Sequence, residues 1–128
     1  MGPAEDFTNF VNAVIDKSAF GNIKAYIDFA KSAPDARIIA GGVCDDTEGY
    51  FIQPTLIETT NPRFKTMEEE IFGPVMTVYV YEDDKFEETL RLCDATSPYA
   101  LTGAIFAQDR AAVLKRRTSW NMRPATST

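Results

Sequence analysis

The sequence predicts an α/β fold, in which strands form a sheet that is flanked by helices. Residues 18–32 carry apolar side chains at helical spacing, and residues 75–81 alternate as a strand does. Along the second half of the chain, segments of these types follow in the order strand, helix, strand, helix. That alternation is typical of sheets whose strands are joined by helices.

The first predicted element is a helix over residues 18–32. Pro34 ends it, because proline cannot continue a helix. Residues 7–15, FTNFVNAVI, are expected to form a short apolar turn or helix ahead of it. The apolar stripe of the helix recurs at three- and four-residue steps, at Phe20, Ile23, Ile27 and Ala30.

Two extended segments follow, separated by a turn. The run RIIAGG, residues 37–42, predicts a strand closed by two glycines, and CDDTEG, residues 44–49, predicts the turn. The run YFIQPTLIE, residues 50–58, is expected to be extended. Its Pro54 indicates either an edge strand or a bulge, because proline donates no ladder hydrogen bond. Residues 59–67 are expected to form a loop.

The clearest strand covers residues 75–81 and is expected to lie inside the sheet. Its side chains alternate between two faces, with Val75, Thr77, Tyr79 and Tyr81 on one face and Met76, Val78 and Val80 on the other. Apolar residues on both faces predict a sheet that is covered on both sides.

A helix over residues 84–95 is expected to begin at Asp84, whose spacing to Glu87 resembles a capping box. Cys93 lies on the apolar stripe of this helix and is therefore expected in the core. The stripe also includes Phe86 and Leu90.

A further strand over residues 102–107 is expected to run parallel to the strand 75–81. The helix 84–95 would join the two in a right-handed crossover. Asp109 is expected to cap a final helix that starts with RAAVLK.

Composition and charge narrow the class of function. The 128 residues suit one domain, and a formal charge of −6 without a basic stripe argues against a nucleic-acid partner. No apolar run approaches the roughly 20 residues that span a bilayer, so no membrane partner is expected. The N-terminus lacks the features of a secretory signal. We therefore expect a cytoplasmic protein, or one of the mitochondrial matrix if the source is eukaryotic.

The residue types also limit the chemistry. Cys44 and Cys93 lie far apart, so neither a disulfide framework nor a zinc or other metal site is expected. The sequence has no histidine, which is the commonest general base. No catalytic residue is assigned.

One segment stands out as a candidate site, Glu70-Ile71-Phe72-Gly73-Pro74. It resembles the E-x-F-G-P segment of the NAD(P)-dependent aldehyde dehydrogenase superfamily. The runs YFIQPTLIE and LTGAIFAQD resemble two strands of that family, in the same order and at similar spacing. The resemblance covers residues 3–115, and the runs DFTNFVNAVIDKSAFGNIKAYIDFAK and VYVYEDDKFEETL are similar to the 1-pyrroline-5-carboxylate dehydrogenases of proline catabolism.

The resemblance implies specific roles for Glu70 and Phe72, and the backbone chemistry of glycine and proline indicates roles for the two residues that follow. Glu70 would accept hydrogen bonds from the nicotinamide-ribose hydroxyls of NAD, and Phe72 would pack against that end of the cofactor. Gly73 would let the backbone approach a ligand, and Pro74 would fix the backbone where it enters the strand. Glu68 and Glu69 are expected to be solvated loop residues.

The resemblance also implies what these residues do not supply. The nucleophilic cysteine, the general-base glutamate and the dinucleotide domain of the family precede the matched region, and neither Cys44 nor Cys93 matches that nucleophile. We therefore expect residues 1–115 to be a partial catalytic domain, with an incomplete sheet flanked by helices. This chain alone is expected to be inactive and to hold no bound NAD.

Residues 116–128, RRTSWNMRPATST, interrupt an amphipathic helix and have no periodicity. In a shifted reading frame, each new codon consists of the third base of one codon and the first two bases of the next. The codons possible for this segment are compatible, in that frame, with a helix end followed by Ala-Gly-Asn-Phe-Tyr, which the resemblance leads us to expect here. We expect a frameshifted tail, the alternative being a native variable one, and the coding DNA decides between them.

The function expected from the resemblance is that of an NAD-dependent aldehyde dehydrogenase. The intact parent would oxidise a small aldehyde, glutamate semialdehyde in equilibrium with 1-pyrroline-5-carboxylate, to glutamate. The alternative is a stand-alone, non-enzymatic binding or self-association domain. In either case an exposed sheet edge could join copies into a homo-oligomer.

Overall fold

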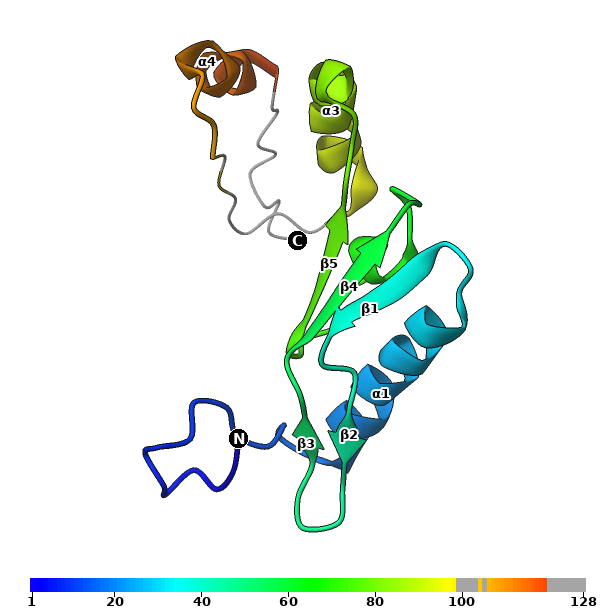
Figure 1. The fold of residues 1–128 in the computed structure, drawn as a ribbon, viewed down its shortest axis with the longest axis vertical. Helices are drawn as coiled ribbons and strands as arrows, with labels where there is room; N and C mark the ends of the chain where they lie inside the picture. The colour runs from blue at the N-terminus through cyan, green and yellow to red at the C-terminus, as the bar shows by residue number, and fades with distance from the viewer. Residues whose placement is uncertain (99–103, 105, 120–128) are drawn as a thin grey trace, which may run out of the picture. The chain divides into compact units, whose positions relative to one another are not determined.

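The computed structural model describes residues 1–98, 104 and 106–119. It divides into two compact units, Met1–Val80 and Tyr81–Thr128 (Figure 1). None of the helices in the described part of the chain is both long enough and apolar enough to cross a membrane.

Helix α1, Lys17–Ser32, confirms the first predicted element. It begins where the carboxylate of Asp16 accepts a hydrogen bond from the backbone N–H of Ala19 at 2.7 Å, which satisfies one of the free donors of the first turn. It ends one residue before Ala33, whose backbone is extended as expected ahead of a proline. All four residues of the predicted stripe are buried. Residues 7–15, by contrast, form turns and irregular chain, so the helical alternative for them is wrong.

The first unit holds a mixed sheet of three strands in the order β1-β4-β5 (Figure 1). β1, Ala36–Ala40, runs antiparallel to β4, Thr55–Thr59, and β4 runs parallel to β5, Val75–Tyr79. The short helix α2, Lys65–Glu68, lies in the connection between β4 and β5. The loop predicted over 59–67 therefore contains the start of a helix.

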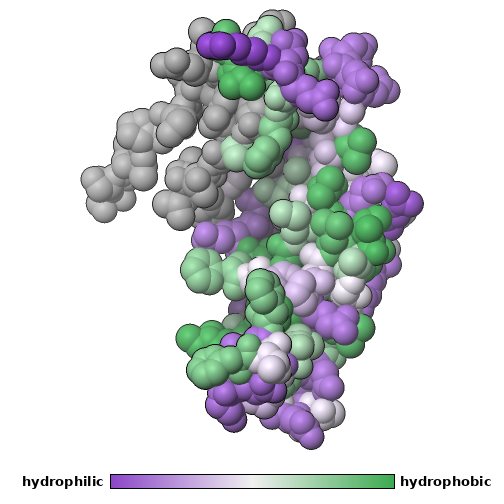
Figure 2. Space-filling model, turned by 60° about the vertical axis from the view of Figure 1, so that its left-hand side comes forward, coloured by the Kyte–Doolittle hydropathy of each residue, from purple (hydrophilic) through white to green (hydrophobic). Residues whose placement is uncertain are grey.

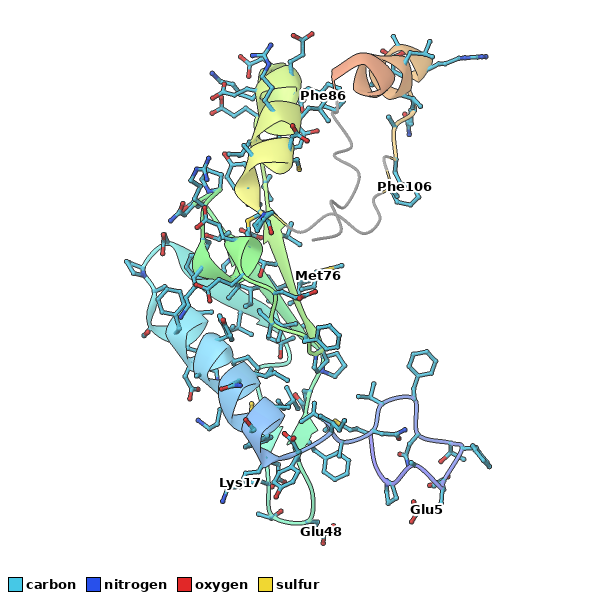
Figure 3. All side chains as sticks on the ribbon, turned by 180° about the vertical axis from the view of Figure 1, so that it is seen from behind. Glu5, Lys17, Glu48, Met76, Phe86 and Phe106 are labelled. Atoms are coloured by element: carbon cyan, nitrogen blue, oxygen red, sulfur yellow. The ribbon has the colours of Figure 1, made fainter. Side chains whose placement is uncertain are left out.

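Between β1 and β4 the chain makes a second, smaller antiparallel pair. β2, Cys44–Asp45, and β3, Phe51–Ile52, form a hairpin whose tip carries Glu48 (Figure 3). The predicted turn over 44–49 is thus correct only for its tip, since Cys44 belongs to a strand.

Pro54 lies between β3 and β4, and β4 is the central strand of its sheet. Both alternatives raised for Pro54 are therefore wrong. The irregularity in strand pairing falls on β1 instead, between Ile38 and Ala40.

The core lies between α1 and one face of the strands. Residues of α1 enter both clusters of buried side chains. The first consists of Phe20, Ile23, Ile27 and Ile52, and the second of Ala30, Ile57 and Phe64. Since α2 also covers this face, through a 2.6 Å contact between the hydroxyls of Thr66 and Thr77, both helices lie on the same side of β5.

The opposite face of β5 is open in the described structure. Met76 is 66% exposed, Val78 37% and Val80 67%, and Figure 3 shows Met76 pointing away from α1. Hydrophobic residues are accordingly visible among polar ones on the surface in Figure 2. The prediction of a sheet covered on both sides is therefore wrong for these residues. Apolar side chains on both faces of a strand show that both faces can be buried. Whether a face is buried depends on which helices or strands pack against it.

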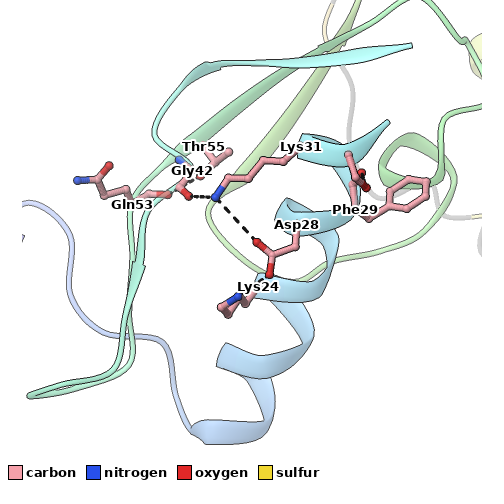
Figure 4. A network of polar contacts seen from close by, with 8 residues as sticks. Lys24, Asp28, Phe29, Lys31, Gly42, Gln53 and Thr55 are labelled. Atoms are coloured by element: carbon pink, nitrogen blue, oxygen red, sulfur yellow. Dashed lines mark hydrogen bonds and ion pairs between the residues drawn. The ribbon is translucent and has the colours of Figure 1, made fainter. Parts of the chain in front are cut away.

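A polar network fastens α1 to the turn after β1 (Figure 4). The ammonium of Lys31 donates to the carbonyl of Gly42 at 2.6 Å, and the N–H of Gly42 donates to the hydroxyl of Thr55 at 3.0 Å. Lys24, which forms a hydrogen bond with Asp28, lowers the pKa of that carboxyl. Gly41 and Gly42 both have positive φ, 74° and 82°, as such a turn requires.

The second unit contains a 3₁₀ turn, Asp83–Lys85, and the helices α3, Phe86–Thr96, and α4, Arg110–Ser119. Asp84 lies inside the 3₁₀ turn and no side chain caps α3, so the predicted capping box is wrong. Cys93 is exposed, which also corrects its expected place in the core. The carboxylate of Asp109 accepts from the N–H of Ala111 at 2.8 Å, as predicted for a cap.

The predicted strand 102–107 lies largely outside the described residues, as does the tail beyond Ser119.

Two glycine-to-alanine variants compare the need for glycine in the turn after β1 with the need for glycine on α1. In Gly41→Ala the new Cβ would lie 2.1 Å from the carbonyl oxygen of Pro54. Together with the positive φ, this clash with backbone is expected to lower the free energy of unfolding by at least about 3 kcal/mol. In the matched variant Gly21→Ala, on α1, the Cβ meets nothing within 4 Å. That change is expected to raise the free energy of unfolding by about 0.5–1 kcal/mol. Urea unfolding measures both, and a Gly41→Ala protein as stable as the parent would contradict the turn geometry.

Candidate functional site

The candidate site is the connection from Glu69 to Pro74, which follows α2 and leads into β5. Its residues alternate between attachment to the fold and projection into solvent. Ile71 is half-buried and packs on the first core cluster, whereas Glu70 and Phe72 on either side of it are exposed. The loop therefore presents an acid and an aromatic ring from a backbone that is fixed between them.

Both ends of the loop are hydrogen-bonded. At the first end, the hydroxyl of Tyr26 donates to the carboxylate of Glu69 at 2.5 Å. At the second, the carbonyl of Pro74 accepts from the backbone N–H of Thr55 at 2.8 Å, which ties the loop to the start of β4. Pro74 thus occupies the predicted place at the entry to the strand.

Gly73 lies close against α1, so that a larger residue at this position would force the side chain of Ile23 to move. A Cβ at this position would lie 2.5 Å from Cδ1 of Ile23 and 2.9 Å from its Cγ1. The expectation from the sequence was that Gly73 permits a close approach to a ligand. The structure provides a different reason, since the close approach it describes is to α1.

Phe72 has an unusual backbone conformation. Its φ is +56°, and it is the only residue other than glycine with positive φ among the described residues. Phe72 is 89% exposed, so no burial of the side chain compensates for this conformation. A bulky residue with positive φ costs on the order of 1–2 kcal/mol. Strain of this kind persists where the surroundings fix the backbone, and it is frequent at functional sites.

The three consecutive acids Glu68, Glu69 and Glu70, at the junction of α2 and the loop, differ in their surroundings. Glu68 ends α2, is half-buried and pairs with Arg63 at 3.1 Å, so the expectation of a solvated loop residue is wrong for it. Glu69 is exposed but is held by Tyr26. Within the described residues, the carboxylate of Glu70 has neither a hydrogen bond nor an ion pair, so both of its oxygens remain available as acceptors.

Sequence reasoning missed Tyr26. Its position three residues after Ile23 places it near the same face of α1, but the sequence holds no signal that its hydroxyl reaches a residue 43 positions away.

Neither cysteine is placed as a nucleophile. Burial raises the pKa of the half-buried Cys44 thiol, and the opposing charges of Lys31 and Lys24 do not overcome that effect. Cys93 is exposed on α3. Across the described part of the chain, no group of three or more acidic, cysteine or histidine residues could hold a metal ion. The arrangement is therefore suited to binding a ligand by hydrogen bonds and a flat apolar surface.

A family model described as "Aldehyde dehydrogenase family" matches residues 1–122 of this chain. Delta-1-pyrroline-5-carboxylate dehydrogenase, mitochondrial, of Dictyostelium discoideum is 61% identical over 113 residues, which cover 88% of this chain and 20% of that protein. The protein of the same name from Danio rerio is 57% identical over 111 residues, or 87% and 20% of the two chains. The chain thus spans about a fifth of the length of the curated relatives it matches.

Solved structures give the same comparison. The Delta-pyrroline-5-carboxylate dehydrogenase of Mycobacterium tuberculosis bound with NAD matches with a TM-score of 0.79 and 40% identity, over 90% of this chain and 20% of that one. The 1-pyrroline-5-carboxylate dehydrogenase of Thermus with bound NAD matches with a TM-score of 0.70 and 30% identity, over 84% and 20%. These matches confirm the predicted fold class, an α/β sheet flanked by helices that is part of a larger catalytic-domain fold.

The strained backbone at Phe72 is expected to lower the stability of the folded chain, so that exposing the aromatic ring here costs free energy of unfolding. Phe72→Gly is expected to raise the free energy of unfolding by about 1 kcal/mol, because glycine adopts a positive φ without steric cost. Phe72→Ala is the matched control, since it removes the same exposed ring and keeps the Cβ. Urea unfolding should rank the glycine variant above both the alanine variant and the parent. Equal stability of the two variants would contradict a strained backbone.

The two thiols are expected to differ in reactivity. A thiol reacts as its thiolate, so a raised pKa at Cys44 shifts its alkylation to higher pH than that of an ordinary thiol. In the folded chain at pH 7.5, iodoacetamide is expected to modify the exposed Cys93 first, and the alkylation rate of Cys44 should level off at a higher pH than that of an ordinary thiol. Peptide mass spectrometry measures both rates, and unfolding in urea should remove the difference. Faster labelling of Cys44 at neutral pH would show it to be activated.

Proposed function

Because this chain belongs to the aldehyde dehydrogenase family, we propose that it forms the part of a 1-pyrroline-5-carboxylate dehydrogenase that holds the nicotinamide-ribose end of NAD. The observation that carries this proposal is the presentation of Glu70 and Phe72 from a loop anchored on both sides of them. The names of the relatives support the substrate class, and the two structures solved with NAD support the cofactor.

The residues present fit this end of the cofactor. The carboxylate of Glu70, which has no partner among the residues that the structure describes, offers two oxygens, which suit the two neighbouring hydroxyls of a ribose. The exposed ring of Phe72 offers a flat apolar surface against which a planar ring can be oriented. When bound, NAD supplies the hydride acceptor, and the contribution of this chain is to hold and orient it. Gly73 and Pro74 are assigned the supporting role of fixing the loop on α1 and β4.

The activity proposed for the intact enzyme is oxidation of glutamate semialdehyde, in equilibrium with 1-pyrroline-5-carboxylate, to glutamate. A nucleophile and a general base are needed for that reaction. Cys44 and Cys93 do not have the surroundings of a nucleophile, so we assign to this chain the binding of NAD and no bond-making step.

The division into residues 1–115 of the family and a tail from 116 stays a prediction. If the source is eukaryotic, the mitochondrial relatives favour the matrix as its location.

A chimera tests the assignment of Glu70. Residues 3–115 would replace the corresponding segment of the Dictyostelium discoideum relative, which is expected to keep NAD-dependent oxidation of 1-pyrroline-5-carboxylate. In that chimera Glu70→Ala is expected to raise the KM for NAD by about 10- to 100-fold, the effect of losing hydrogen bonds to a charged group. The matched control is Glu68→Ala, two residues away, which is expected to leave the KM for NAD unchanged.

The outcomes of this test are distinct. An active chimera in which Glu70→Ala binds NAD as well as the parent would remove Glu70 from the site. A folded chimera without activity would count against the proposed substrate. The unfused 128-residue chain is the negative control and is expected to reduce no NAD.

Self-association is a second candidate, favoured by the open face of β5. This strand ends the sheet order, and in the described part of the chain no strand pairs with its outer edge. No charged residue occurs from Ile71 to Tyr81, so nothing on the strand opposes pairing with a second copy. Light scattering after size-exclusion chromatography is expected to detect dimers, and Val78→Lys to reduce them. A monomer at high concentration would contradict this candidate.

A further inference from the structure

We propose that Tyr26 is a positioning residue for the candidate site, and that through Glu69 it fixes where Glu70 and Phe72 are presented. The inference rests on the proposed function, because it concerns the same loop. It assigns a role in the site to a residue of α1 that carries no part of the motif itself.

The contact between Tyr26 and Glu69 is direct and charge-assisted. The phenol oxygen lies 2.5 Å from Oε2 of Glu69, at the short end of the range for a hydroxyl that donates to a carboxylate. Glu69 immediately precedes Glu70 and closes α2, since its backbone N–H donates to the carbonyl of Lys65 at 3.0 Å. Fixing the side chain of Glu69 therefore fixes the direction in which the chain leaves α2 toward Glu70.

Lys65 holds Tyr26 from a second direction. Its ammonium lies 4.9 Å from the centroid of the Tyr26 ring and 5.7 Å from that of Phe29. A cation over the ring is attracted to its π-electrons, so Lys65 helps to hold the ring of Tyr26 in place. Lys65 and Glu69 are four residues apart, so α2 places a cation on the ring and a carboxylate on the hydroxyl of the same tyrosine.

The other end of the loop rests on the same helix. Gly73 packs against Ile23, which lies three residues before Tyr26 on α1. Glu70 and Phe72 thus lie between one polar and one apolar contact with α1. An apolar contact is non-directional, whereas a hydrogen bond to a carboxylate is directional. We therefore assign to Tyr26 the orientation of the loop, and to the apolar contact its attachment.

The neighbouring pair of Arg63 and Glu68 is the internal comparison. It has similar chemistry, at 3.1 Å, and it also involves an acid of the same trio. Glu68 belongs to α2 itself, however, and does not precede the presented residues directly. Breaking that pair should leave the loop unchanged.

Kinetics of the chimera separate positioning from general stability. Tyr26→Phe removes only the hydroxyl and keeps the ring under Lys65. It is expected to raise the KM for NAD about fivefold, the equivalent of one net hydrogen bond, with kcat changed less than twofold. Glu69→Ala should reproduce this effect, and Glu69→Gln, which keeps an acceptor oxygen, should restore most of the parent value. The control Arg63→Ala should leave both constants unchanged.

Hydrogen exchange of the 128-residue chain gives a second readout that needs no activity. In Tyr26→Phe the amides of residues 70–73 are expected to exchange at least threefold faster, with those of β4 unchanged. Uniformly faster exchange across the sheet would mean that the hydroxyl only stabilises the fold, which would overturn the proposal.

The two proposals fail in different ways. If Glu70→Ala weakens NAD binding in the chimera but Tyr26→Phe and Glu69→Ala do not, the positioning role is wrong and the proposed function stands. If Glu70→Ala itself has no effect, the proposed function fails. In that case faster exchange in the loop would still assign Tyr26 to holding the loop, without a role in NAD binding.

Discussion

The packing of the apolar stripe of α1 against one face of the strands is the interaction on which the rest of the structure depends. Ile23 and Ile27 are 1% and 0% exposed, and they meet Ile52 of the hairpin in one cluster, while Ala30 meets Ile57 of the sheet in the other. A single helix therefore joins two separately paired groups of strands. Because the candidate loop also rests on this helix, the geometry of the site follows from the same packing.

The loop illustrates how a fold stabilises a locally unfavourable conformation. The backbone at Phe72 is one that a bulky residue avoids, and the exposed ring contributes no burial in return. The compensation comes from its neighbours, since Ile71 packs in the core and Pro74 is hydrogen-bonded to the start of β4. Phe72 therefore combines a fixed backbone with an exposed side chain. A binding surface needs both of these properties, whereas a residue in the core needs no exposure.

The parts of the fold that could be predicted are those that depend only on the spacing of residues along the chain. The stripe of α1 and the cap at Asp109 were predicted because burial and capping follow from local spacing. The open face of β5, the exposure of Cys93 and the absence of a cap at Asp84 were not. Each depends on which element packs nearby, and apolar spacing does not encode that. For the site, the motif identified Glu70 and Phe72 as candidates, but the contact between Tyr26 and Glu69 joins residues that only the fold brings together.

The hairpin of β2 and β3 lies inside the longer connection between β1 and β4, and this nesting has a consequence for the order of assembly. Pairing β1 with β4 directly requires the chain to close a long loop, at an entropic cost that grows with loop length. Once Cys44 pairs with Ile52, the segment between them no longer contributes to that loop, and Gly42 already lies within reach of Thr55. Assembly from the hairpin tip inward is therefore the route of lowest entropic cost. On this route the parallel partner β5, with the loop that precedes it, joins a sheet that has already formed.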